Sequence, residues 1–493
     1  MGYIIVIDQG TTSSRAIVFD EKGNIVSSSQ EEFRQIYPKP SYVEHDPIDI
    51  LSSVRSVIST ALTRARVKYS EILGIGITNQ RETVVVWDKV TGEPLYNAIV
   101  WQCRRTKDRC DELRKEGYED IIKHKTGLKI DSYFSATKIE WLINNVPAVR
   151  EALEKNTLLV GTIDTYLMWQ LSGGKIYKTD YTNASRTMLF NINTLEWDKD
   201  LCNLFKIPAD ILPEVCPSSY NYGTTSGDIL GVKLPICGVA GDQQSALFGQ
   251  SCFNKGDLKV TYGTGCFLLV NSKDEFINSN NGLITTLSCE TKDKPMYALE
   301  GSVFVGGAVI QWLRDELKLI NKASESEELA RSVVDNNGVY VVPAFVGMGA
   351  PYWRNDAEGM ITGITRGTNR CHIVRASLEA ICYQVNDLIL AMNKDLGYKI
   401  NNVKVDGGAV VNNFLMEFQA DISDALIIRP TNVEVTALGA YYLACLELNI
   451  FSSLEEIASR SSIDKTFISS IDDSLRDKYI DGWNKALRKC FAK

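Results

Sequence analysis

The feature that most constrains this chain is a strand, turn and strand pattern that occurs once in each half of its 493 residues. In the first copy, apolar residues 4–7 and 16–19 flank a turn of Gly, Thr and Ser. In the second copy, residues 258–262 and 266–270 flank Gly263-Thr264-Gly265. Such a repeat predicts an internal duplication of one α/β unit, and the chain is longer than one hydrophobic core usually organises. We therefore predict two domains, residues 1–248 and 249–493, that face each other across a cleft.

The composition restricts the class of partner. The formal net charge of −8 argues against a general affinity for nucleic acid or an anionic membrane, because such binding depends on clusters of Lys and Arg. No apolar run is long enough to span a bilayer, and we expect no signal peptide, because the first residues lead directly into a predicted strand. The 12 cysteines form no C-x-x-C pair and the 3 histidines are far apart, so neither zinc nor a disulfide framework is indicated. We expect a cytoplasmic protein that binds small solutes.

The first turn has the chemistry of a phosphate site. Its hydroxyl groups and unhindered backbone N–H groups both suit phosphate oxygens. Asp8 stands where the first buried strand emerges into whatever the loop faces, and a carboxylate in that place suits a metal ion. A solvated hairpin turn is the alternative, which the loop alone does not exclude.

Two further apolar runs end in residues that suit a ligand, and ligand groups in α/β proteins tend to lie at strand ends. The run 72–78 leads to Arg81 and Glu82, which need partners if they are buried between the flanking strands. As an isolated pair they are more typical of a solvated turn, and the flanking apolar runs weaken that alternative. The run 99–100 leads to Trp101, which is either a core residue or the wall of a pocket.

Two later runs end in Gly and Asp before a helix. The run 235–240 leads to Asp242, which is either an exposed catalytic carboxylate or only a helix N-cap. The run 403–406 leads to a pair of glycines, which allow close approach of a nucleotide to the backbone. Residues 177–186 are rich in small hydroxylated side chains and are typical of a loop under a cleft. The chain has no P-loop and no dinucleotide fingerprint, so phosphate would be bound by paired hairpins.

Five motifs together resemble the FGGY carbohydrate kinases, and among them the members that phosphorylate glycerol. These motifs are Asp8 to Arg15, Ile77 to Thr83, Gly241 to Gln244, Tyr262 to Gly265, and Asp406 to Ala409. The family's two long signatures are matched by residues 133–145 and 359–379. The resemblance implies an α/β fold of two duplicated actin-like (ribonuclease H-like) domains with a cleft between them, the first for polyol and phosphate and the second for nucleotide.

The resemblance also implies a role for each matched position. The polyol would be held by Arg81, Glu82, Trp101, Tyr133, Asp242, Gln243 and Phe267. The nucleotide would be bound by Thr11, Thr12, Ser13, Arg15, Thr264, Gly307, Gln311, Gly408 and Asn412. Asp8 would organise Mg²⁺ through water, as suits a metal that keeps most of its waters. A triol needs several fixed donors and acceptors with apolar groups over its carbon side, and the first set supplies them.

The implied activity is transfer of the γ-phosphoryl group of ATP to glycerol, which gives sn-glycerol 3-phosphate and ADP. It would depend on Mg²⁺, with Asp242 as the general base. The resemblance further implies a homodimer or a homotetramer. One alternative is a kinase of the same family for another polyol or a ketose. A second is a protein-binding ATPase of the actin or chaperone type, which would have no use for Arg81, Glu82, Tyr133 and Asp242 as a set.

Overall fold

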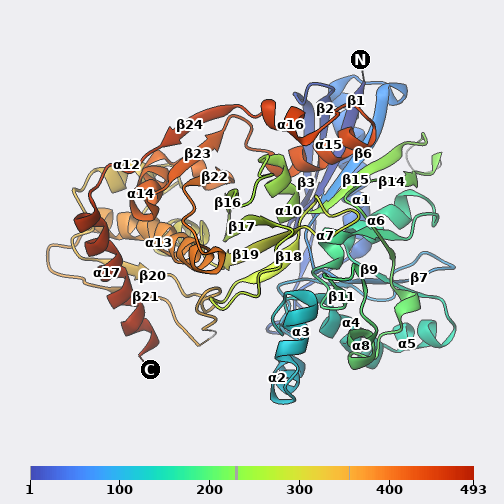
Figure 1. Cartoon of the computed structure of the whole chain (residues 1–493), viewed down its shortest axis with the longest axis horizontal. Helices are drawn as coiled ribbons and strands as arrows, with labels where there is room; N and C mark the ends of the chain where they lie inside the picture. The colour runs from blue at the N-terminus through green and yellow to red at the C-terminus, as the bar shows by residue number, and fades with distance from the viewer. Residues whose placement is uncertain (1, 228–230, 355, 493) are drawn as a thin grey trace.

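The computed structural model describes residues 2–227, 231–354 and 356–492, which form two lobes built on two open sheets (Figure 1). The first sheet has the order β14-β15-β6-β1-β2-β3 and the second has the order β18-β19-β17-β16-β22-β23-β24. The strands of the first sheet are β1 (Tyr3–Gln9), β2 (Ser13–Asp20), β3 (Ile25–Glu32), β6 (Ile72–Asn79), β14 (Ser219–Thr224) and β15 (Pro235–Gly241). Those of the second are β16 (Leu258–Tyr262), β17 (Cys266–Lys273), β18 (Ile284–Leu287), β19 (Tyr297–Val303), β22 (Asn402–Asp406), β23 (Leu426–Pro430) and β24 (Ile463–Phe467).

The pairing of the strands confirms the predicted duplication. β1 pairs antiparallel with β2 and parallel with β6, and β15 is parallel to β6. In the second sheet β16 pairs antiparallel with β17 and parallel with β22, and β23 is parallel to β22. A backbone hydrogen bond of 2.9 Å closes the turn of each opening hairpin. Gly10 N donates to Ser13 O in the first hairpin, and Gly263 N donates to Gly265 O in the second. The parallel strands of each sheet therefore end at one edge, beside the turn of its hairpin.

Two helices cover the opposite faces of the first sheet. The helix α1 (Pro47–Ala65) begins after the predicted N-cap Asp46, whose side chain accepts a bond from Ile48 N, and its apolar side packs on Ile5 and Ile7. Because alternate residues of a strand point to opposite faces, Ile4 and Val6 point the other way. They pack against α15 (Val435–Glu447), which lies beside β1 and β2 although it follows β23 of the second sheet in the chain (Figure 1).

The two halves touch where α15 crosses α10 (Asp242–Gly249), the helix after β15. A Cβ on Gly249 would lie 2.0 Å from the carbonyl oxygen of Val435, and one on Gly439 would lie 1.9 Å from that of Ser245. Only glycine permits so close an approach of the two backbones. The domain boundary predicted at residues 248–249 lies at the end of α10 and stays a prediction.

The remaining elements surround the two sheets. The first half adds β4 (Gln35–Ile36), β5 (Glu44–His45), β7 (Val85–Asp88), β8 (Ala98–Ile99), α2 (Lys107–Lys115), α3 (Glu119–Thr126), α4 (Ser135–Asn145), α5 (Pro147–Glu154), β9 (Leu158–Gly161), α6 (Ile163–Leu171), β10 (Lys178–Asp180), α7 (Tyr181–Ala184), β11 (Phe190–Asn191), β12 (Glu196–Trp197), α8 (Lys199–Leu204) and β13 (Glu214–Cys216). The second half adds α11 (Ala308–Asp315), α12 (Glu325–Arg331), β20 (Tyr340–Val342), β21 (Met360–Thr362), α13 (Arg370–Leu396), α14 (Asn413–Ser423), α16 (Leu454–Ser459) and α17 (Asp473–Phe491).

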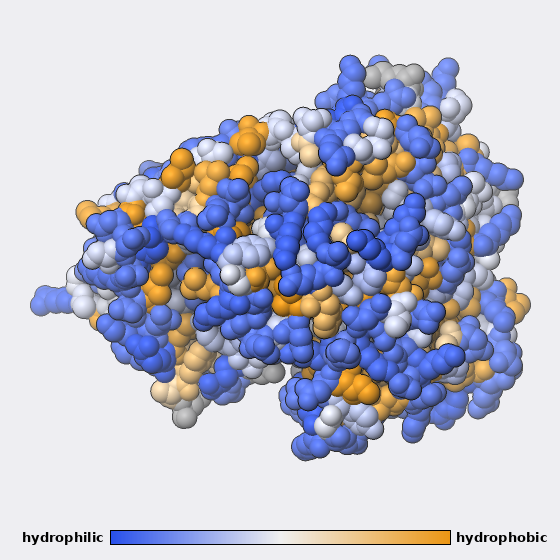
Figure 2. All heavy atoms as spheres, in the orientation of Figure 1, coloured by the Kyte–Doolittle hydropathy of each residue, from blue (hydrophilic) through white to orange (hydrophobic). Residues whose placement is uncertain are grey.

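Two expectations are refined by these elements. The segment 177–186, predicted as a loop, contains the short elements β10 and α7 before it reaches Arg186. Among the described helices, none combines the length and the apolar character that crossing a membrane requires. The face of the molecule in Figure 2 is largely hydrophilic, with its apolar side chains in small separate areas.

Candidate active site

The seven predicted polyol-binding residues line one cavity of about 690 Å³ between the two halves. Its walls come from the ends of β6 and β15, from the two hairpin turns, and from β17 and β19. Six of the seven belong to the loops of the first half and to the start of α10, including Tyr133 in the loop before α4, whereas Phe267 comes from β17 of the second half. The structure thus brings together residues that are spread over almost two hundred positions of the sequence.

Arg81 and Glu82 do not form a solvated turn. Each side chain is only 2% exposed. Both charges are therefore buried, and each needs a partner of opposite charge or a hydrogen bond inside the protein. The Arg81 guanidinium donates from Nη1 and Nη2 to the two oxygens of Glu300 at 2.6 and 2.9 Å, and from Nη1 to Gln244 Oε1 at 3.0 Å. Glu82 has a positive φ of 63°, a conformation that costs free energy in a non-glycine residue and is typical of functional sites.

Arg186 and Glu300 are buried partners of the predicted site residues Glu82 and Arg81, and neither was predicted from the sequence. Glu300 lies in β19 and lines the cavity, and Arg186 donates from Nε to Glu82 Oε1 at 2.6 Å. A single carboxylate inside the apolar run 297–303 was the available signal for Glu300, because a buried charge needs a partner. Arg186 ends the hydroxyl-rich segment that was predicted to lie under a cleft, but its own role could not be read from that composition.

Asp242 is the first residue of α10, and the N-cap of that helix is Gly241. The N-cap alternative for this carboxylate is therefore wrong. Asp242 Oδ1 lies 3.2 Å from Arg81 Nε, and its side chain is 32% exposed toward the cavity. Burial raises the pKa of Asp242, although the positive charges of Arg81 and Lys259 act to lower it. The carboxylate is thus oriented, accessible and more basic than an ordinary Asp.

Gln243 is oriented by a buried lysine. Lys259 Nζ donates to Gln243 Oε1 and also to Thr261 Oγ1 at 2.8 Å. An ammonium group has donors only, so it fixes the carbonyl oxygen of the Gln243 amide on its own side. Gln243 is left with its amide N–H groups to donate to a ligand in the cavity.

Aromatic rings form much of the cavity wall, among them the three that were predicted to bind the polyol. Trp101 and Tyr133 meet edge to face with centroids 5.5 Å apart, and Phe267 lines the same cavity from β17. Trp101 is therefore a pocket wall, and its Nε1 donates to Thr11 Oγ1 at 2.9 Å. This bond ties the polyol side of the cavity to the turn of the first hairpin.

The predicted phosphate residues divide into two groups. Thr11, Thr12 and Thr264 line the cavity. Ser13 and Arg15 are not among the described residues that line it, since Arg15 turns aside to form an ion pair with Glu434 and to donate to Gln30 Oε1 at 3.1 Å. The two hairpin turns thus face the same space, whereas the guanidinium of Arg15 is bound to the segment just before α15.

Asp8 occupies the end of β1 close to three other charged groups. Burial raises the pKa of Asp8 to about 7, with Arg15 lowering it and Asp242 and Glu434 raising it further. Among the described residues, no cluster of three or more His, Cys, Asp or Glu is arranged to hold a metal. Carboxylate oxygens are the donors that Mg²⁺ takes, usually one or two beside water and phosphate, so Asp8 fits this role.

A second cavity of about 490 Å³ collects the predicted nucleoside residues. Gly307, Gln311, Gly408 and Asn412 all line it, and Thr264 lines both cavities. The two spaces therefore adjoin at the turn of the second hairpin.

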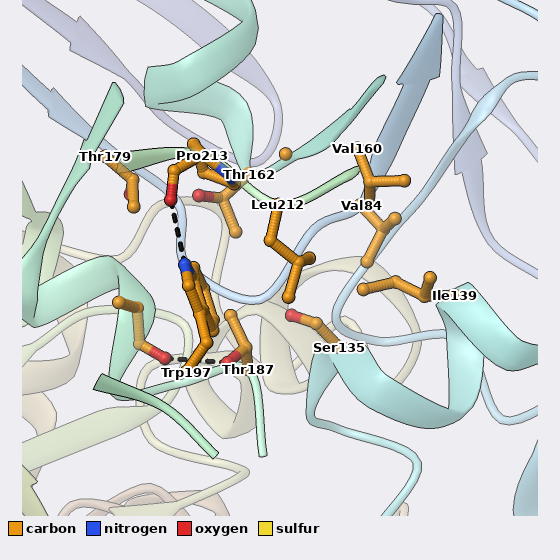
Figure 3. A pocket seen from close by; sticks show the side chains of 12 residues that line it. Val84, Ser135, Ile139, Val160, Thr162, Thr179, Thr187, Trp197, Leu212 and Pro213 are labelled. Atoms are coloured by element: carbon orange, nitrogen blue, oxygen red, sulfur yellow. Dashed lines mark hydrogen bonds between the residues drawn. The ribbon is translucent and has the colours of Figure 1, made fainter. Parts of the chain in front are cut away.

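A third cavity lies in the core behind Glu82. Its volume is about 20 Å³, room for about one water molecule. Figure 3 shows its mainly apolar walls, with Trp197 donating from Nε1 to the carbonyl oxygen of Pro213 at 2.8 Å. Ser135, on its rim, donates from Oγ to the backbone oxygen of Glu82 at 3.0 Å. This cavity is too small for a polyol and belongs to the packing that supports Glu82.

Comparisons with known proteins agree over nearly the whole chain. The N-terminal domain of the FGGY family of carbohydrate kinases matches residues 3–249, and the C-terminal domain of that family matches residues 258–448. Glycerol kinase 2 of Thermotoga maritima is 56% identical over 489 residues, which cover 99% of each chain. Glycerol kinase of Fusobacterium nucleatum is 56% identical over 491 residues, again 99% of each chain.

Solved structures give the same result for the fold. The structure of Plasmodium falciparum glycerol kinase with ADP is 40% identical, has a TM-score of 0.94, and is matched over 100% of this chain and 99% of that one. Xylulose kinase from Lactobacillus acidophilus has a TM-score of 0.88 at 22% identity, over 99% of this chain and 97% of the other. The second likeness is one of fold alone.

Proposed function

This chain belongs to the FGGY family of carbohydrate kinases, and from that premise we propose that it phosphorylates glycerol with ATP, giving sn-glycerol 3-phosphate. The observation that carries the proposal is the single cavity in which Arg81, Glu82, Tyr133, Asp242 and Gln243 meet two aromatic walls. A small triol is recognised by several convergent donors and acceptors and by apolar cover of its carbon atoms. Relatives named glycerol kinase, at 56% identity, support this acceptor.

Asp242 is the proposed general base. The attacking hydroxyl must lose its proton as the new bond to phosphorus forms. Asp242 stands at the start of α10 with part of its carboxylate facing the cavity, and Arg81 Nε at 3.2 Å holds one of its oxygens in place. The other oxygen can then accept the proton of a hydroxyl bound by Arg81 and Glu82.

The nucleotide would lie across the second cavity, with its phosphates at the paired turns. Thr11, Thr12 and Thr264 supply hydroxyl and backbone donors on the side of the acceptor, and Gly307, Gln311, Gly408 and Asn412 surround the nucleoside. The solved relative with ADP supports use of an adenine nucleotide. Ser13 and Arg15 join this set if Arg15 exchanges Glu434 for phosphate when ATP binds.

Asp8 is the residue that would hold Mg²⁺, through water and beside the phosphates. When bound, the ion neutralises negative charge on the transferred group. Because the transition state of phosphoryl transfer is loose, most of the rate comes from positioning and charge neutralisation. Closure of the two halves would exclude water, which otherwise would take the phosphoryl group.

The release of ADP from MgATP by the purified protein tests the proposal. It would be measured without an acceptor and then with glycerol, xylulose, erythritol or gluconate. Strong stimulation by glycerol alone supports the proposal, and stimulation by another acceptor overturns the specificity but keeps the mechanism. Turnover that needs no acceptor would favour the protein-binding ATPase.

The assembly of the protein also stays a proposal. The family resemblance predicts a homodimer or a homotetramer in the cytoplasm. Light scattering on the purified protein distinguishes these states from a monomer.

A further inference from the structure

Four charged side chains meet behind the polyol side of the cavity, and two of them have no part in the proposed function. Arg81 and Glu82 follow β6, Arg186 follows α7, and Glu300 lies in β19 of the second half. The side chains of Arg81 and Glu82 are 2% exposed, and those of Arg186 and Glu300 are 0% exposed. Two guanidinium and two carboxylate groups thus form a charge-balanced, almost fully buried cluster at the wall of the cavity, and its members persist as ions only because they pair.

The contacts of Arg81 leave one donor for a ligand. A guanidinium has five N–H groups. Glu300 takes one from Nη1 and one from Nη2, Gln244 takes the second from Nη1, and Nε faces Asp242. Among the described residues, the second N–H of Nη2 has no acceptor. Glu300 therefore both anchors the group and limits what it can offer.

The contacts of Glu82 leave one acceptor. Arg186 Nε donates to Oε1 at 2.6 Å, and in the described part of the chain no group donates to Oε2. Arg186 also donates from Nη2 to Glu300 Oε1 at 3.1 Å, so one guanidinium joins both carboxylates. Its planar group lies 5.6 Å from the ring centroid of Tyr133, a further wall of the cavity.

We propose that Glu300 and Arg186 are positioning residues for polyol recognition, which hold Arg81 and Glu82 so that one N–H and one carboxylate oxygen face the hydroxyls of the acceptor. The inference rests on the proposed function and deepens it. Glu300 belongs to the second sheet, and the other three residues belong to the first half. The binding site for the polyol therefore forms only when the two halves are correctly placed relative to each other. Burial alone would raise the pKa of Glu300, but Arg186 and Arg81 outweigh it and lower the pKa to about 2. The carboxylate thus stays ionised.

The variants Glu300→Gln and Arg186→Lys test the proposal. Gln keeps the shape of Glu300 without its charge, and Lys keeps the charge of Arg186 without the fork that joins two carboxylates. We expect each variant to raise the KM for glycerol by about 10-fold or more, the scale of a weakened hydrogen bond to a charged group. The KM for ATP should change by less than about 3-fold. In thermal melts, the stabilisation by glycerol should be lost and that by ADP retained.

Glu379→Gln is the matched control. Glu379 is a buried carboxylate of the second half that accepts from Arg375 Nε at 2.8 Å and from Asn336 Nδ2 at 2.8 Å, and it lines neither large cavity. It should lower the Tm without changing the KM for glycerol. The proposal is overturned if Glu300→Gln and Arg186→Lys behave like this control, or if they raise both KM values equally.

Wild-type protein separates this proposal from the proposed function. If glycerol does not stimulate wild type, the proposed acceptor has failed, and the same KM comparison is made with the acceptor that does stimulate. If Glu300→Gln does not fold, Arg186→Lys carries the test with the same criteria. An enzyme that no acceptor stimulates overturns both proposals.

Discussion

The two sheets share one order over six strands, to which the second sheet adds β18, but the two halves carry different chemistry at the ends of their strands. In the first half, β1, β6 and β15 lead to Asp8, Arg81 and Asp242, all with ionisable side chains. In the second half, the hairpin turn and the end of β22 carry glycines, and Asp406 is 2% exposed and accepts from Gln250 Nε2 at 3.3 Å. One copy of the unit thus offers charged groups, whereas the other offers room beside the backbone. A duplicated fold can divide one reaction into proton transfer and nucleotide binding.

Asp242→Asn should give the largest effect, because it removes the proposed base. We expect kcat to fall by roughly 10²–10⁴-fold, the usual scale for general-base catalysis. Steady-state kinetics with glycerol checks this value. Asp406→Asn alters a strand-end carboxylate of the other half and should lower kcat by less than about 10-fold. Equal losses of kcat in the two variants would contradict the proposed difference in chemistry between the two halves.

Gly407→Ala and Gly408→Ala compare two neighbours on the nucleotide side. Gly407 has a φ of 94°, and a Cβ there would lie 2.5 Å from the carbonyl oxygen of Tyr262. We expect Gly407→Ala to lower the free energy of unfolding by about 2 kcal/mol or more. A Cβ on Gly408 meets no described atom within 4 Å, so Gly408→Ala should fold normally and raise the KM for ATP by about 3- to 10-fold. Denaturant titration and kinetics measure these effects, and an unchanged KM for ATP in Gly408→Ala would contradict the proposed role of this turn.

The pH dependence of kcat/KM sharpens the role of Asp242. A general base works only when it is deprotonated, so activity is present above its pKa and decreases as the pH falls through it. Burial raises this pKa above the ordinary value of 3.8, so we expect an acidic limb of about tenfold per pH unit that begins above the range of an ordinary Asp. Rate profiles of wild type and Asp242→Asn check this, because the limb should be absent from the residual activity of the variant.

Glu434→Gln should give the smallest effect. The side chains of Arg15 and Glu434 are 28% and 36% exposed, and ion pairs with such exposure contribute about 0–1 kcal/mol to stability. The variant should leave the Tm nearly unchanged and lower the KM for ATP by about 2- to 3-fold, because Arg15 is then free to bind phosphate. Titration of ATP measures this. A raised KM would mean that Glu434 supports nucleotide binding directly.

The local parts of the fold and of the site could be predicted from the sequence. Strand runs that end in Arg81 and Asp242, a helix capped by Asp46, and two hairpins with Gly and Thr turns are patterns within a few neighbouring residues. Long-range pairing could not be predicted in this way. Glu300 contacts Arg81 across 219 positions of the sequence. The residues next to either one do not indicate which residue is its partner.

Two other features depended on the assembled structure. Lys259 orients Gln243 from the next strand, and Arg15 turns toward Glu434, away from the cavity. The position of a long, flexible side chain is chosen by the charges that surround it in space. The sequence therefore identified Arg15 as a cation near the turn but not the partner that holds it.

The position of α15 has a consequence for biosynthesis. This helix covers Ile4, Val6 and Phe19, yet its residue Tyr441 leaves the ribosome long after those strands have been made. The nascent chain thus carries an uncovered apolar sheet face through most of translation, a state that is prone to aggregation and to chaperone binding. We expect a chain truncated after Gly249 to bind the dye ANS at this face, whereas the full-length protein, with α15 in place, should not.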